Sequence, residues 1–213
     1  MLIRAVFFDL DGVLIDACDW HYYALNAALK KIANVEIKRD EHATTFNGLP
    51  TRKKLRILTE QGRIPGDCHD NVWGEKQRLT EEVIRTRAKI DINKQEMHDL
   101  LRARGLVLCC VTNSIKKTAK LMLEKTGQLG YMSAVITNED VKDPKPNPEG
   151  YRKAMRLFEL QPEEVLIVED SDKGYESAIM SGAYVLRVRN ASDVNIKSIV
   201  RKIEILEKEM EKQ

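Results

Sequence analysis

The first strand-like segment of the chain ends in two closely spaced carboxylates, and this feature constrains the fold most. Residues 5–10 are predicted to be a buried strand of a parallel sheet, because the segment begins with four consecutive apolar residues. Asp9 and Asp11 lie at its C-terminal end, and Gly12 follows directly. In open α/β sheets, ligands bind at this edge. Because two adjacent buried carboxylates are costly, the pair predicts a cation or a reaction that uses both, rather than a simple polar exit from a strand.

Five apolar runs are predicted to be strands, and helical patterns of ordinary length separate the last four. Strands and helices that alternate in this way indicate a parallel sheet with helices on its faces, so the predicted fold class is α/β. The predicted strands cover residues 5–10, 107–111, 134–137, 165–168 and 184–188.

The gap between the first and second strands is long and helical. From about residue 15 to residue 89 the sequence shows no convincing strand and several amphipathic helices, at residues 20–32, 51–61 and 70–87. Such a block leaves the ligand-binding edge, so we expect an inserted helical cap that covers the site as a lid. The predicted domains are a core of residues 1–15 and 90–213 and a cap of residues 16–89.

Composition narrows the possible partners and the compartment. The chain has 213 residues, and its net charge of +2 gives no electrostatic reason to expect nucleic acid or an anionic membrane as a partner. No apolar stretch approaches the roughly 20 residues of a membrane span, and no signal-peptide pattern is present. The four cysteines lack the spacing of a zinc site and are expected to be free thiols. We therefore expect a cytoplasmic protein.

The C-terminal segment after Asn190 is charged and is predicted to be helical. Its apolar residues recur at spacings of three and four, which is typical of an amphipathic helix. Because the stripe is too short for a stable coiled coil, we expect it to pack on the core of its own chain, with a homodimer as the alternative. The predicted state is thus a monomer or a weak homodimer. The stripe consists of Ile196, Ile199, Ile203, Leu206 and Met210.

Polar groups follow the predicted strands at four places, and all are expected to converge on one edge of the sheet. They are Asp9 and Asp11, Thr112 and Asn113, Lys145 in a proline-rich loop, and Glu169 and Asp170.

The chemistry of these groups is complementary. Four carboxylates in one crevice repel each other unless a hard cation such as Mg²⁺ is present. The Thr112 hydroxyl, the helix start that follows it and the charge of Lys145 suit a phosphate. One aspartate can then attack phosphorus to form an aspartyl-phosphate. The other can protonate the leaving oxygen and later deprotonate water.

Taken together and in this order, the residues resemble the motifs of the haloacid-dehalogenase-like hydrolase superfamily. The first motif matches Asp9-Leu10-Asp11-Gly12, the second Thr112, the third Lys145 and the fourth Glu169-Asp170. The resemblance implies a Rossmann-like core, with Asp9 as the nucleophile and Asp11 as the acid and base. It also implies Mg²⁺ held by Asp9, the backbone carbonyl of Asp11 and Asp170, with Glu169 close by. Asp11 argues against dehalogenation, because the dehalogenases of this superfamily lack an acid there.

The helical block resembles the cap of the β-phosphoglucomutase and phosphoglycolate-phosphatase branch. The resemblance implies a hinge role for His21, and a grip on a distal phosphate for Arg52 in Gly48-Leu49-Pro50-Thr51-Arg52. Lys76 lies near a cap lysine of the same enzymes, and Asn113 is a further candidate for substrate binding. The alternative for His21, Arg52 and Lys76 is that they are ordinary surface residues of amphipathic helices.

The leading functional hypothesis is a Mg²⁺-dependent phosphatase that acts on a small phosphorylated metabolite. A phosphomutase of the β-phosphoglucomutase type is the nearest alternative, and the candidate residues serve both. A receiver-like phospho-switch is a hypothesis from another class, but the long helical insert and the acidic pair after the fourth strand oppose it. A catalytically inactive binding protein is the remaining alternative. The sequence does not identify the substrate.

Overall fold

The computed structural model of the protein describes residues 3–211, and its core is a five-stranded parallel sheet with the order β3-β2-β1-β4-β5. The predicted α/β class is therefore confirmed, and all five predicted strands are present. The strands are β1 (Ala5–Phe8), β2 (Val107–Val111), β3 (Ala134–Ile136), β4 (Val165–Glu169) and β5 (Tyr184–Arg187).

The main difference from the expected strand limits lies at the end of β1, which stops two residues early. The Asp9 amide still donates a hydrogen bond to the Val168 carbonyl (3.0 Å). The chain then leaves the sheet and turns at Gly12, whose φ of +91° favours glycine over any other residue.

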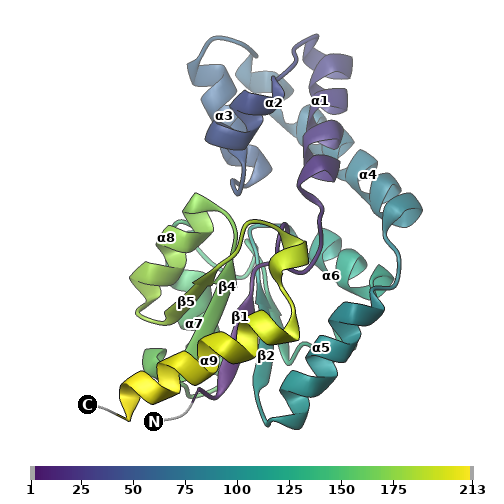
Figure 1. The fold of residues 1–213 in the computed structure, drawn as a ribbon. Helices are drawn as coiled ribbons and strands as arrows, with labels where there is room; N and C mark the ends of the chain where they lie inside the picture. Colours follow the sequence, from purple (N-terminus) through teal and green to yellow (C-terminus); the bar gives the residue numbers. More distant parts are fainter. Residues whose placement is uncertain (1–2, 212–213) are drawn as a thin grey trace.

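Helices cover both faces of the sheet (Figure 1). The alternation of side chains along β1 explains why both faces need a cover, because Val6 and Phe8 enter one apolar cluster while Ala5 and Phe7 enter another. Helices α5 (Ile92–Ala103), α6 (Lys116–Lys125) and α9 (Ile196–Met210) contribute to the first cluster, and α7 (Glu149–Leu157) and α8 (Asp172–Ser181) to the second. Short 3-10 turns lie at η3 (Leu129–Tyr131), η4 (Pro162–Glu164) and η5 (Ala191–Asp193).

The C-terminal helix α9 packs on the chain's own core, as the sequence predicts. Ile199, Ile203 and Leu206 are buried in the first cluster, and Ile196 and Met210 pack partly buried against it. This apolar stripe is therefore already covered within one chain.

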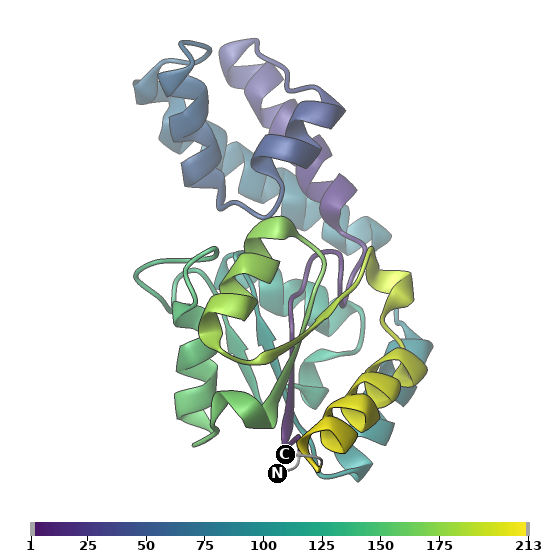
Figure 2. The ribbon, with the colours of Figure 1, turned by 60° about the vertical axis from the view of Figure 1, so that its left-hand side comes forward.

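A block of helices stands over the carboxyl ends of the strands (Figures 1 and 2). It has an apolar cluster of its own, built around Leu29, Phe46 and Leu58. Ile84, near the end of its last helix, instead belongs to the core cluster beside the sheet. The limits of the cap at residues 16 and 89 therefore stay a prediction. The block comprises α1 (Cys18–Ala33), α2 (Arg39–Glu41), the π-helical turn η1 (His42–Phe46), α3 (Thr51–Glu60), η2 (Gly66–Cys68) and α4 (His69–Arg87).

Within residues 3–211, none of the helices combines the length and apolar character needed to cross a bilayer.

Candidate active site

The strand order places the predicted motifs side by side. β1 lies between β2 and β4, at the point where the sheet begins to extend in the opposite direction. Asp9 therefore emerges between Thr112, which follows β2, and Glu169, the last residue of β4. The residues that the sequence assigns to one edge do meet there.

Lys145 binds two carboxylates at the centre of this edge. Its Nζ donates to Asp9 Oδ1 (2.6 Å), to Glu169 Oε1 (2.5 Å) and to the Val111 carbonyl (2.7 Å). Burial of Lys145 alone would lower its pKa, but the charges of Asp9 and Glu169 outweigh burial and raise it above its usual value. Lys145 is therefore a permanent cation beside Asp9.

Glu169 is completely enclosed by protein groups. Its Oε1 also accepts a hydrogen bond from the Tyr151 hydroxyl (2.7 Å), and its Oε2 accepts one from the Asp170 amide (3.2 Å). Gly174 in α8 makes this enclosure possible, because a Cβ there would lie 2.1 Å from the carboxylate oxygens. The sequence motif after β4 thus includes a glycine that allows the helix to approach the acid.

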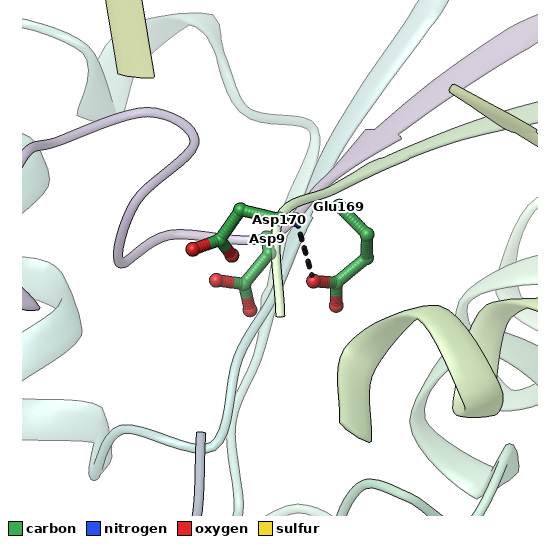
Figure 3. Close-up of side chains that lie close together, drawn as sticks. All are labelled: Asp9, Glu169 and Asp170. Atoms are coloured by element: carbon green, nitrogen blue, oxygen red, sulfur yellow. Dashed lines mark hydrogen bonds between the residues drawn. The ribbon is translucent and has the colours of Figure 1, made fainter. Parts of the chain in front are cut away.

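Three carboxylates form an acidic cluster where β1 and β4 end (Figure 3). One oxygen from each of Asp9, Glu169 and Asp170 lies within 4.8 Å of the others. Burial and the charge of Glu169 raise the pKa of Asp170 to about 7, and burial with repulsion from the neighbouring acids raises that of Asp9. Asp170 Oδ1 is buried without a hydrogen-bond partner among the described residues.

These features fit a divalent cation. A hard cation would supply a partner for the free Asp170 oxygen and would remove the repulsion that raises both pKa values. Gly12 allows the loop after β1 to pass close to this cluster, because a Cβ at position 12 would lie 2.2 Å from Asp170 Oδ2.

Asp11 is held by His21 of the helical block and by Ser114, which follows β2. His21 Nε2 lies 2.8 Å from Asp11 Oδ1, and the Ser114 hydroxyl donates to Asp11 Oδ2 (2.8 Å). Lys76 Nζ lies 3.2 Å from His21 Nδ1. Because the ammonium is a donor only, Nδ1 accepts and Nε2 carries the proton that faces Asp11. Burial would raise the pKa of Asp11, but His21 and Ser114 outweigh it and lower the pKa.

The Asn113 side chain joins three parts of the site. Its Nδ2 donates to the carbonyl of Gly48 in the helical block (2.7 Å) and to that of Lys145 (3.0 Å), and its Oδ1 accepts from the Lys145 amide (3.0 Å). Both N–H groups of the amide are used within the protein in this conformation. Thr112, next to it, is buried, and its hydroxyl oxygen accepts a hydrogen bond from the Ser114 amide (3.0 Å).

A cavity of about 490 Å³ lies between the sheet edge and the helical block. Glu169 and Asp170 lie beside Asp9 in the acidic cluster rather than in the cavity wall. The other sequence-predicted residues all border the cavity: Asp9, Asp11, His21, Arg52, Lys76, Thr112, Asn113 and Lys145.

Arg52 borders the cavity but directs its guanidinium elsewhere. Its Nη1 donates to Asp70 (2.8 Å), its Cζ lies 5.1 Å from the centre of the Trp73 ring, and its side chain is 58% exposed. In this conformation the Arg52 guanidinium binds Asp70 and Trp73 rather than facing the sheet edge that carries Asp9.

Sequence reasoning missed several residues that line or support the site. Lys54 is buried in the cavity wall although it belongs to a charged run, and a signal was available because Lys54 lies one helical turn before the buried Leu58. His42 lies in the π-helical turn, for which the sequence shows no periodic pattern. Tyr151 and Ser114 were not predicted because their roles depend on contacts between separate elements.

Comparison with known proteins gives consistent results. The model of a family described as haloacid dehalogenase-like hydrolase matches residues 6–188. A phosphoglycolate phosphatase of Nitrosospira multiformis is 29% identical over 191 residues, which cover 87% of this chain and 83% of that protein. A phosphorylated carbohydrates phosphatase of Thermotoga maritima is 26% identical, with 84% of this chain and 82% of that protein covered.

Among solved structures, a β-phosphoglucomutase from Clostridium difficile has the same fold. It superimposes with a TM-score of 0.82 at 18% identity, and the match covers 95% of this chain and 98% of that one.

Proposed function

Because the chain belongs to the haloacid dehalogenase-like hydrolase family, we propose that it is a Mg²⁺-dependent phosphatase that hydrolyses a small phosphorylated metabolite through an aspartyl-phosphate on Asp9. One observation carries the proposal: Asp9, Asp11, Thr112 and Lys145 border one cavity, with the acidic cluster directly beside Asp9. The relatives named as phosphatases of phosphoglycolate and of phosphorylated carbohydrates support the same reaction class.

Asp9, Asp170 and the backbone carbonyl of Asp11 are the groups that we expect to hold Mg²⁺. The Glu169 carboxylate belongs to the same cluster and also anchors Lys145. When bound, the ion would neutralise charge on the phosphoryl oxygens and on the clustered acids.

Asp9 is the proposed nucleophile because its carboxylate faces the cavity at the sheet edge. Attack on phosphorus forms the bond from the Asp9 oxygen and breaks the bond to the ester oxygen of the substrate. Lys145, 2.6 Å from Asp9, opposes the rise in the pKa of this carboxyl that burial and the neighbouring acids cause, and it stabilises the charge of the transferring group. The Thr112 hydroxyl accepts its hydrogen bond from the Ser114 amide, so its own proton is available for a phosphoryl oxygen.

Asp11 is the proposed acid and base. With a proton bound, Asp11 protonates the leaving oxygen in the first step; the resulting carboxylate then takes a proton from the water that hydrolyses the aspartyl-phosphate, which restores protonated Asp11 for the next cycle. The contacts with His21 and Ser114 favour the carboxylate from which this second step starts. They also fix the direction in which the carboxylate points.

A phosphomutase is the second candidate, and the contact between His21 and Asp11 under the cap favours it. A mutase must keep water away while the aspartyl-phosphate waits for its second acceptor, and a cap that contacts the core through Gly48 and Asn113 would serve this purpose. Incubation with β-glucose 1-phosphate separates the two candidates. A phosphatase releases inorganic phosphate, whereas a mutase yields glucose 6-phosphate.

The proposed function predicts that a generic aryl phosphate is hydrolysed in the presence of Mg²⁺ and not in the presence of EDTA. Asp9→Asn should lower kcat by about 10³-fold or more, because the amide is a poor nucleophile of almost the same shape. Phosphate release and the melting temperature should be measured together, so that loss of activity is distinguished from unfolding.

Asp16→Asn is the matched control, because Asp16 is an exposed aspartate seven residues further along the same segment. It should keep full activity. If Asp9→Asn keeps more than about a tenth of the activity, or if EDTA has no effect on the wild type, the proposal is wrong.

A further inference from the structure

Tyr151 has the largest fully buried side chain among residues 3–211, and the proposed reaction gives it no part. Its side chain belongs to the second apolar cluster, beside the sheet. Helix α7, which carries Tyr151, begins four residues after Lys145, so both residues come from one short stretch of the chain. A phenylalanine would fill the same apolar space at a lower desolvation cost, so packing does not explain the hydroxyl group.

The Tyr151 hydroxyl binds the carboxylate that anchors the cation of the site. It donates to Glu169 Oε1 (2.7 Å), the same oxygen that accepts a hydrogen bond from Lys145 Nζ (2.5 Å). The Asp170 amide donates to Glu169 Oε2 (3.2 Å), and the Glu169 side chain extends toward α8, away from that of Asp170 (Figure 3). Without the Tyr151 hydroxyl, Lys145 would be the sole donor to Oε1 within residues 3–211.

Lys145 uses all three protons of its ammonium group within the protein. Besides Glu169, its acceptors are Asp9 Oδ1 (2.6 Å) and the Val111 carbonyl (2.7 Å). A phosphoryl oxygen that arrives beside Asp9 must therefore draw one of these protons away from its present acceptor. Because Tyr151 and Lys145 share the negative charge on Glu169 Oε1, this oxygen holds the ammonium less strongly than it would with Lys145 as its sole donor.

The aromatic ring of Tyr151 also contacts the cation itself. Lys145 Nζ lies over the ring, 4.8 Å from its centre, which is within the range of a cation–π contact. One rigid side chain thus contacts Lys145 through its ring and the counter-ion of Lys145 through its hydroxyl. Tyr151 does not border the cavity, so its effect on a substrate must pass through these two neighbours.

We propose that Tyr151 is a positioning residue that holds Lys145, partly through Glu169, where the ammonium can shift toward the transferring phosphoryl group. This inference rests on the proposed function, because the charge that Lys145 meets develops during phosphoryl transfer. The contribution of Tyr151 should therefore be larger in the transition state than in the bound ground state.

Tyr151→Phe tests this role because it removes the hydroxyl and keeps the ring. With an aryl phosphate and saturating Mg²⁺, kcat should fall by about 10-fold or more, as expected for the loss of one hydrogen bond to a charged group. KM should change by less than about 3-fold. A purely structural role would instead lower the melting temperature and leave kcat of the folded enzyme unchanged, and that result would refute the inference.

Tyr131→Phe is the matched control. The Tyr131 hydroxyl also donates to a carboxylate, Asp99 Oδ2 (3.2 Å), but neither residue borders the cavity. This variant should keep the kcat and KM of the wild type. Equal losses of kcat in the two variants would show that removal of a tyrosine hydroxyl has a general effect, and the role of Tyr151 would be refuted.

Inhibitor binding gives a readout that does not depend on the turnover of the variant. Orthovanadate can take the five-coordinate geometry of phosphoryl transfer, and it should inhibit Tyr151→Phe at least about 10-fold more weakly than the wild type. Inorganic phosphate is tetrahedral like the ground state, and its inhibition constant should differ by less than about 3-fold between the two proteins. Equal changes for both inhibitors would contradict a positioning role.

A magnesium titration separates this role from support of the acidic cluster. If excess Mg²⁺ restores the wild-type kcat to Tyr151→Phe, the hydroxyl supports the metal site rather than Lys145, and the inference is wrong. If Tyr151→Phe keeps the kcat of an active, Mg²⁺-dependent wild type, the inference is refuted and the proposed function stands. If the wild type hydrolyses no aryl phosphate, the proposed function fails and the inference fails with it.

Discussion

Single residues in this protein are held in charge states that their burial opposes. Lys145 stays protonated because two carboxylates contact it, and contacts with His21 and Ser114 lower the pKa of Asp11 although burial would raise it. Lys54 has no such support, and burial together with the charge of Lys76 lowers its pKa to about 7. The three residues show that charge at the site depends on specific contacts rather than on exposure alone.

His98, away from the cavity, predicts how stability changes with pH. Its ring is fully buried beside Phe8, Nε2 bonds to Gln128 Oε1 (3.0 Å), and burial lowers the pKa to about 4. In the unfolded chain the pKa is about 6.5, so between about pH 6.5 and 4 the unfolded state binds a proton that the folded state does not. Stability should therefore be complete above pH 6.5 and fall below it, by about 2 kcal/mol at pH 5 from this residue.

Urea unfolding at pH 7.5 and pH 5 tests this prediction. His98→Gln should show a smaller loss of stability between the two pH values than the wild type, because glutamine does not titrate. His69→Gln provides a control for removal of a less buried histidine, and should leave the loss unchanged. If both variants behave alike, His98 is not the group responsible.

At the scale of elements, α9 illustrates how one helix can have two very different faces. Ile203 is 5% exposed and packs in the core cluster, whereas Ile205 is 42% exposed. Two residues along a helix are rotated by about 200°, so the two isoleucines face in nearly opposite directions. Ile203 contributes to the core, and Ile205 does not.

Alanine substitutions in α9 should therefore have unequal effects on stability. Ile203→Ala should lower the free energy of unfolding by about 2–5 kcal/mol, because it removes buried methylene groups and leaves a cavity. Ile205→Ala should change it by less than about 0.5 kcal/mol. Denaturant titration of both variants measures the difference, and equal values would mean that α9 is not docked as described.

The sheet, and the edge of it that carries the candidate site, were predictable from the sequence for a physical reason. A parallel strand buried on both faces leaves a continuous apolar run, and the polar residue that ends the run marks the sheet edge. The ends of these runs predict that Asp9, Thr112 and Asp170 lie at this edge. Cys109 and Cys110 point to opposite faces of the sheet, because Cys110 belongs to the first core cluster and Cys109 to the second.

The cavity wall formed by the helical block was only partly predictable. Arg52 and Lys54 lie two residues apart on α3, and the sequence favours arginine as the phosphate ligand. The structure turns Arg52 toward Asp70 and buries Lys54. Which face of α3 meets the cavity depends on how the whole block tilts over the sheet, and no local pattern records that tilt.

At the scale of the whole molecule, few polar contacts connect the Gly48 loop of the helical block to the core. Asn113 donates to the Gly48 carbonyl (2.7 Å), and Lys173 reaches the Thr45 carbonyl at 3.4 Å. A Cβ at Gly48 would lie 3.2 Å from Ser171 Oγ, so this loop packs closely on the core. The contact from Asn113 is the stronger of the two, because it is shorter and because the Asn113 side chain is also fixed by hydrogen bonds to Lys145.

Asn113→Ala should lower kcat/KM about 10- to 100-fold, because it leaves the Gly48 and Lys145 carbonyls without their donor. Lys173→Ala removes only the longer contact and should change kcat/KM by less than about 3-fold. Steady-state kinetics with an aryl phosphate measures kcat/KM of both variants, and melting curves check that each variant is folded. Similar small effects in the two variants would show that Asn113 does not hold the loop for catalysis.

The helical block keeps most of its apolar packing in a cluster separate from those beside the sheet. Rearranging side chains within this cluster would therefore change the cavity wall formed by the helical block. The wall at the sheet edge, where we propose that Asp9 attacks phosphorus, would keep its shape. Divergence toward a new metabolite can therefore proceed within this cluster, as long as His21 and Lys76 of the same block keep the contacts that hold Asp11.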